Sequence, residues 1–359
     1  MKIFLCECKK MMSFRIFWII FVCLFAINGY VQIDRINDRY YTPESYRSFF
    51  SETKDMSLEE IQDYTNEMLE RQNNGEYIEF PMMLVYDMSE LSKECENYPE
   101  YLNSIKEQTN NMSAVSIWGD SDTFSYRNIQ KTPSAYENLP AEPLPLAASF
   151  GLENTFTSPI TDFMGIFLVF LAVCGIILKD REHGITFLLS SMPKGRSSLI
   201  LSKLFAVSLF ASFVAVMLFA ENLVIGGALY GIGELQRPIQ SVFGFYQCNL
   251  AVSVGEFLLL FFILKIASYL LFAMIFSLIC TVSRNNLMIY GISGAVCTIA
   301  FLCYRLIPQN SVFQLFHDWN PIKFTQTAEI LGTYQNVNLF GYPVSLKISM
   351  IIIIVITIV

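Results

Sequence analysis

The chain has 359 residues, of which 53% are hydrophobic and only 16% are charged, yet its formal net charge is −8. Soluble globular proteins carry roughly a quarter charged residues, so this composition excludes a disordered protein, a collagen-like repeat and a disulfide scaffold. The acidic balance also argues against a nucleic-acid binder. The class of protein therefore has to be inferred from where the apolar runs and the charges lie along the chain.

The first apolar run covers residues 16–31 and follows a basic start. A helix crosses the hydrocarbon core of a bilayer with roughly 17–25 mostly apolar residues. A secretory signal peptide has the same layout, but Asn28-Gly29-Tyr30 is not a small-x-small cleavage site. We therefore expect residues 1–31 to form a cytoplasmic N-terminus and a retained first span.

A long polar segment, residues 32–158, follows the first run. It holds 23 acidic and nine basic residues, a net charge of −14, whereas the rest of the chain holds nine acidic and 15 basic residues, a net of +6. Ser57 precedes a helical apolar period, and residues 98–112 have the pattern of a second helix. The segment is therefore predicted to be a mainly helical extracellular domain inserted between spans one and two.

The remaining chain, residues 159–359, contains five further apolar runs. Residues 348–359, which end the last run, would reach only about 18 Å as a helix, so we expect a sixth span that is truncated in this sequence. The fold class is then an all-α polytopic membrane protein with a six-span core. The later spans are expected near residues 163–178, 204–229, 257–282, 287–305 and 346–359.

The basic residues indicate the orientation of these spans. With the N-terminus inside, ten basic residues lie in the cytoplasmic segments and only four in the two short outer loops and their flanks, as the positive-inside rule requires. The protein is therefore predicted to be a multi-pass protein of the cell membrane. The ten are Lys2, Lys9, Lys10, Arg15, Lys179, Arg181, Lys194, Arg196, Lys203 and Arg284, and the four are Arg237, Arg305, Lys323 and Lys347.

Two ionisable residues, Glu221 and Lys265, lie deep in apolar runs. Such residues are candidates for a substrate pathway. The alternative is that each marks the end of a span, with residues 257–264 then forming an interfacial or re-entrant helix. Gly227 and Gly231 have the G-x-x-x-G spacing of closely packed helices.

Several catalytic motifs are absent from the sequence. There is no phosphate-binding loop of the G-x-x-x-x-G-K-[ST] type, no H-E-x-x-H and no G-x-S-x-G. The two histidines, His183 and His317, fall on opposite sides of the predicted membrane, which argues against a zinc site or a histidine-based triad. A disulfide between Cys95 and Cys248 is left open. We expect a non-enzymatic membrane protein that binds no metal.

The predicted cytoplasmic connection between the second and third spans, residues 179–203, reads KDREHGITFLLSSMPKGRSSLILSK. Its spacing predicts a short amphipathic helix along the membrane face, followed by a turn. An interfacial helix whose bases reach lipid phosphates would show the same pattern.

The order E-x-G, leucines, S-x-P-x-x-R and then S-K at the head of the next span resembles type-2 ABC transporter permeases. The overall layout of one span, a large outer domain and further spans is also similar to that family, whose usual count is six spans. The resemblance covers most of residues 1–31 and 159–359 and is weaker in the outer domain. Its motif positions are Glu182, Gly184, Leu188, Leu189, Ser191, Pro193, Arg196, Ser202 and Lys203.

The resemblance implies that this chain is the permease subunit of a transporter, an exporter, which moves substrate by alternating access. It would associate with a second permease subunit, identical or different, and with cytoplasmic ATP-binding subunits that use ATP and Mg²⁺. The connection would dock on the ATPase as a coupling helix, with Phe187, Leu188 and Met192 in apolar contact and Glu182 and Arg196 fixing orientation. The family also implies a bacterial cell membrane.

Two other readings stay open. A membrane sensor or scaffold would use the acidic outer domain to bind a peptide or a cell-wall component. A four-span permease with a large outer domain is the second, although five or six apolar runs count against it.

Overall fold

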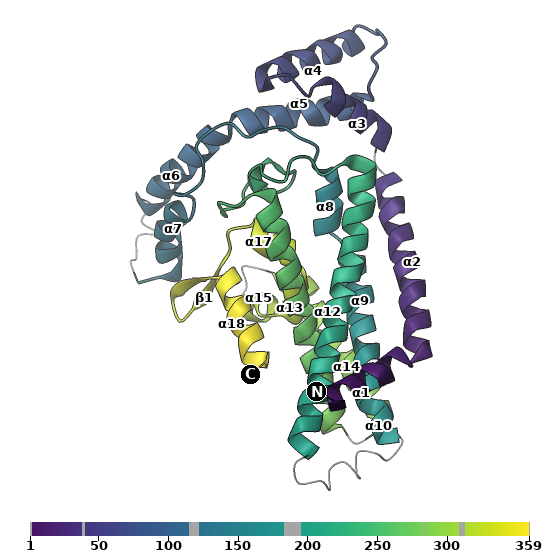
Figure 1. Cartoon of the computed structure of the whole chain (residues 1–359). Coiled ribbons are helices and arrows are strands. Elements are labelled where there is room, and N and C mark those ends of the chain that lie inside the picture. The colour runs from purple at the N-terminus through teal and green to yellow at the C-terminus, as the bar shows by residue number, and fades with distance from the viewer. Residues whose placement is uncertain are drawn as a thin grey trace.

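The computed structural model describes residues 2–37, 40–114, 122–182, 195–283, 285–308 and 313–358. A bundle of long helices carries a smaller helical domain at one end, which we call the inserted domain (Figure 1). The N-terminal helix lies at the opposite end of the bundle, which we call the basal end (Figure 1). This arrangement agrees with an all-α membrane protein.

Within the described residues, five stretches of helix are long and apolar enough to cross a bilayer, and one shorter apolar helix follows them. The third stretch is central, because it contacts the N-terminal helix, the first and second spans and the fourth span. The bundle elements are α1 (Lys2–Met12), α2 (Arg15–Asn37), α9 (Pro159–Val173), the π-helix η1 (Cys174–Leu178), α10 (Lys179–Glu182), α12 (Gly195–Tyr230), α13 (Val254–Val282), α14 (Asn286–Leu306) and α18 (Leu346–Ile358).

Both residues considered as span ends lie within continuous helices. The helix α12 continues through Glu221 to Tyr230. Lys265 does not separate an interfacial helix from a span, because α13 runs unbroken on both sides of it. Ser253 starts α13 with a capping box, in which its side chain and that of Glu256 each bond the other's backbone N–H. Lys265 therefore lies in the fourth turn of α13, inside the bundle.

The inserted domain is helical, as its apolar periodicity predicts. Ser57 caps the second of its helices with a capping box, and residues 98–112 lie in one helix. A chain without regular structure, residues 140–149, leads back to the bundle. The domain consists of α3 (Pro43–Glu52), α4 (Leu58–Asn73), α5 (Met82–Glu96), α6 (Tyr98–Ala114) and α7 (Phe124–Ala135), and α8 (Phe150–Phe156) follows it.

The segment before α18 combines short helices with a hairpin that the sequence analysis did not predict. The hairpin pairs Asn336 with Ser345 and Val337 with Val344, and Gly341 in its turn has a φ of 86°. Arg127 of α7 donates to the carbonyl of Gly341, so the hairpin also contacts the inserted domain. The elements are α15 (Gln314–Asp318), α16 (Pro321–Thr325), α17 (Thr327–Gly332), β1 (Asn336–Leu339) and β2 (Tyr342–Ser345), while the short 3-10 helix η2 (Ile239–Ser241) lies between α12 and α13.

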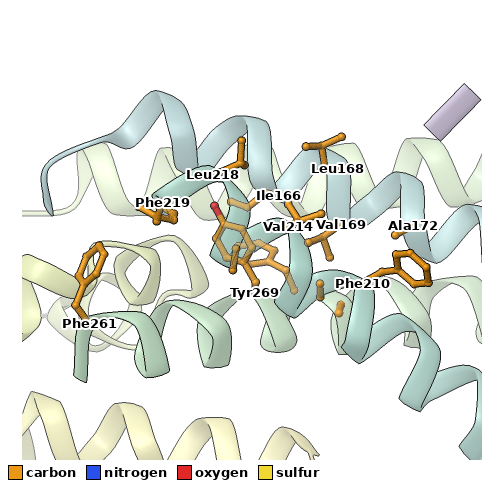
Figure 2. Close-up of a cluster of buried hydrophobic side chains, with 14 of the residues drawn as sticks. Ile166, Leu168, Val169, Ala172, Phe210, Val214, Leu218, Phe219, Phe261 and Tyr269 are labelled. Atoms are coloured by element: carbon orange, nitrogen blue, oxygen red, sulfur yellow. The ribbon is translucent and has the colours of Figure 1, made fainter. Parts of the chain in front are cut away.

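The main apolar core lies between α9, α12 and α13. Figure 2 shows the side chain of Tyr269 among Ile166, Val214 and Phe219, so all three helices contribute to one cluster. Ring centroids of Phe219 and Phe261 lie 5.6 Å apart in an edge-on arrangement. Such interlocking aromatic packing fixes the relative positions of the helices.

A close backbone approach joins α8 to the end of α12. A Cβ atom added to Gly151 would lie 2.6 Å from the carbonyl oxygen of Gly226 and would also meet the carbonyl of Gly231. A Cβ atom added to Gly227, by contrast, would meet only the side chain of Ile232. The close contact therefore uses Gly226 rather than the predicted Gly227.

Replacing Gly151 with alanine is expected to destabilise the protein by about 1–3 kcal/mol, the typical cost of overpacking, because backbone carbonyls cannot move aside. Gly291→Ala is the matched control, since a Cβ there meets nothing within 4 Å. Thermal unfolding of both variants in detergent measures the difference. Equal stability of the two variants would contradict the packing described.

Candidate functional site

A buried ion pair joins α9 to α13 inside the apolar bundle. The Nζ atom of Lys265 lies 2.7 Å and 2.8 Å from the two carboxylate oxygens of Asp162. The two residues are only 1% and 4% exposed. Because an isolated charge in such surroundings is very unfavourable, each residue requires the other.

Further groups complete the surroundings of this pair. Lys265 also donates to the carbonyl of Thr325, the last residue of α16, and its ammonium lies 4.3 Å from the ring centroid of Phe219. The hydroxyl of Tyr269 lies 3.5 Å from Asp162 Oδ1. The Lys265 charge therefore fixes α9, α13 and α16 relative to one another and contacts α12 through an aromatic face.

Sequence reasoning selected Lys265 but missed its partner. Asp162 stands just before an apolar run, where a carboxylate at a helix start has an ordinary explanation in the helix dipole. The available signal was the lysine itself, because a cation within a span requires a counter-charge at similar depth. The Lys265 ammonium has its partners within the packed bundle, so a role in a substrate pathway stays a prediction.

Glu221 belongs to a second polar cluster, which joins α2, α9 and α12. Asn28 donates to Glu221 at 2.9 Å and to Asn222 at 2.7 Å, while the Thr161 hydroxyl donates to the Asn28 side-chain oxygen at 2.6 Å. Buried polar networks of this kind fix the register between spans. A pathway role for Glu221 likewise stays a prediction.

At the basal end, Asp180 joins three elements. Its carboxylate lies 2.7 Å from Lys10 of α1 and 2.5 Å from Lys203 of α12, and Asp180 itself is 3% exposed. Lys10 also pairs with Glu7 at 2.6 Å. These charge-assisted contacts tie the N-terminal helix to both helices that flank residues 183–194.

A second contact ties this region to α13. Arg181 donates to the carbonyls of Ser283 at 2.5 Å and Cys280 at 2.8 Å, which lie at the end of α13 and have no partner within the helix. The π-helix η1 precedes α10, and Gly175 within it lies against the ring of Phe14. Residues around Asp180 thus hold α1, α12 and α13 together.

Most residues of the predicted coupling connection lie outside the described residues, namely Gly184, Phe187, Leu188, Met192 and Pro193. Glu182 is the last residue of α10 and Arg196 lies in the first turn of α12. Lys203 is described and forms the ion pair with Asp180. The helix α12 begins at Gly195, so residues 195–203 of the predicted connection belong to this helix.

Cys95 and Cys248 are both buried and are not joined by a disulfide. Burial, with Glu94 adding to it, raises the pKa of Cys95 to about 12. This thiol is therefore unreactive near neutral pH. Among the described residues no group of three or more His, Cys, Asp or Glu side chains is placed to hold a metal ion.

Replacing Lys265 with methionine is expected to cost about 3–5 kcal/mol of stability, because it leaves the Asp162 carboxylate buried without its partner. The double variant Lys265→Met with Asp162→Leu should recover most of the loss. Thermal unfolding in detergent of the wild type, Lys265→Met, Asp162→Leu and the double variant completes a double-mutant cycle. Additive losses in the double variant would contradict a direct pair.

Comparison with known proteins places the chain in a family. The family described as "ABC-2 family transporter protein" matches residues 1–357, so the match includes the inserted domain, where the sequence resemblance was weakest. No curated protein and no solved structure matches the chain. With five helices long and apolar enough to cross a bilayer, and a family match over almost its whole length, the chain belongs to the ABC-2 transporters, the membrane permeases of ABC systems.

Proposed function

We propose that this chain is the permease subunit of an ATP-driven exporter, in which two permease subunits pair with two cytoplasmic ATP-binding subunits. ATP and Mg²⁺ belong to the partner, because the sequence has no phosphate-binding loop. The family match supports the permease assignment. The observation that carries the mechanism is the Asp180 carboxylate, which gathers the helices on both sides of residues 183–194.

The proposed orientation has the basal end in the cytoplasm and residues 32–158 outside a bacterial cell. Lys10, Lys179, Arg181 and Lys203 all belong to the basal end, as the positive-inside rule favours. In this orientation α18 belongs to the sixth span. The outer side, with the inserted domain, then also holds the short helices η2 and α15–α17 and the hairpin.

The connection at residues 183–194 is proposed to dock on the ATP-binding subunit. Phe187, Leu188 and Met192 would supply apolar contact, with Glu182 and Arg196 fixing orientation. A displacement of this connection would reach α12 through the ion pair of Lys203 with Asp180, and α13 through the hydrogen bond from Arg181 to Ser283. Asp180 and Arg181 both lie in α10, directly before the connection. Closure of the ATPases would then shift several spans together, which is what alternating access requires.

Leu188→Asp is expected to abolish co-purification of the ATP-binding subunit with the tagged permease, because a carboxylate cannot enter an apolar groove. Tyr77→Asp is the matched control, since Tyr77 is 85% exposed on the inserted domain. Quantitative pull-down with an unfolding check on both variants measures the effect. Undiminished co-purification of Leu188→Asp would refute the docking role.

The orientation is tested by thiol labelling. Cys95 is unsuitable because it is buried, whereas Cys6 is exposed and Tyr77 offers an exposed position for Tyr77→Cys. An impermeant maleimide applied to intact cells should label Tyr77→Cys and should reach Cys6 only after permeabilisation. The label that appears after permeabilisation should be lost in the variant Cys6→Ser, which assigns that label to Cys6. Labelling of Cys6 in intact cells would reverse the topology.

A further inference from the structure

A cavity of about 580 Å³ lies between the inserted domain and the bundle. Its walls come from the junction of α3 with α4, from residues 143–148, and from the loop after α12. The volume falls within the usual range of small-molecule sites, about 300–1,000 Å³. Junctions between domains are also common places for such sites.

One buried cation lines this cavity. Arg237 is 4% exposed, and its Nη2 donates to the carbonyls of Ala148 at 2.7 Å and Ile232 at 3.3 Å. Its Nε and Nη1 atoms are buried without a hydrogen-bond partner among the described residues. Two of the three guanidinium nitrogens of Arg237 therefore have no acceptor among the described residues.

The neighbourhood of Arg237 favours an anionic acceptor over a neutral one. Gly233, with a φ of 62°, lets the guanidinium pack close to the backbone, because a Cβ there would lie 3.1 Å from Arg237 Cζ. Burial lowers the pKa of Arg237 and the Glu234 carboxylate opposes this shift. Lys54 and Glu234 are exposed at the cavity and balance each other in charge, so Arg237 leaves the site with one net positive charge.

The rest of the lining is apolar. Phe50, Met56, Leu144 and Leu146 contribute to the walls, and two prolines, Pro143 and Pro145, stiffen the segment that closes one side. A ligand that satisfies Arg237 would therefore place an apolar body against these side chains. A small hydrophilic anion would leave them in contact with water.

We propose that this cavity binds a small single-chain amphiphile that carries a carboxylate or phosphate head, with the head on Arg237 and the apolar chain against Phe50, Met56 and Leu146. Charge-assisted hydrogen bonds from Nε and Nη1 would hold the head. The site is separate from the residues proposed to contact the ATPase. Its occupation does not depend on the direction of transport.

Calorimetric titration of the full chain in phosphatidylcholine nanodiscs, with empty nanodiscs subtracted, tests the proposal. The probes are octanoate, octyl phosphate and 1-octanol, which share a chain and differ in the head. One of the two anions should bind about tenfold tighter than octanol or more, as hydrogen bonds to charged groups allow, and the stronger one identifies the head. Equal binding of all three, or no binding of either anion, would overturn it.

Variants locate the site. Arg237→Gln should reduce binding of the anion to the level of octanol, whereas Glu234→Gln should strengthen it by removing a nearby carboxylate. Arg71→Gln is the control, because Arg71 lies on the surface and pairs with Glu76. If Arg237→Gln does not fold, the affinities of the three probes for the wild type and for Glu234→Gln still test the proposal, because Glu234→Gln should strengthen binding of the anion alone. Unchanged anion binding in folded Arg237→Gln would refute the assignment.

Discussion

The ion pair between Lys265 and Asp162 is the constraint on which the bundle depends. A lysine in the fourth turn of an apolar helix has no access to water, so its position is tolerable only where a carboxylate meets it. That requirement fixes the pairing of α9 with α13. The same ammonium binds the carbonyl of Thr325, so the short helices before α18 are held against the bundle as well.

The second-span helices α9, η1 and α10 carry a buried carboxylate near each end. Asp162 binds Lys265 of α13 at one end, and Asp180 binds Lys10 and Lys203 at the other. The span therefore connects the surroundings of residues 183–194 with the helices below the inserted domain. In the proposed mechanism this continuous element carries movement from the ATPase side towards the outer side.

Apolar periodicity predicted the long helices because a chain that crosses a bilayer must satisfy its backbone within each helix. It also predicted the Ser57 cap and the helix over residues 98–112. Periodicity failed where contacts between distant segments decide the outcome. Lys265 is one case, because its partner carboxylate, Asp162, lies far away in the sequence. The hairpin at residues 336–345 and the Gly151 contact also depend on neighbours that no local pattern indicates.

The central claim is that this chain works as the membrane subunit of an ATP-driven transporter. Its most direct test is ATP hydrolysis by the complex purified through a tag on this chain and reconstituted in lipid. We predict hydrolysis that vanadate inhibits, with an ATP-binding subunit present in amounts equal to the permease. A pure, folded permease that retains no such subunit and no ATPase activity would contradict the account.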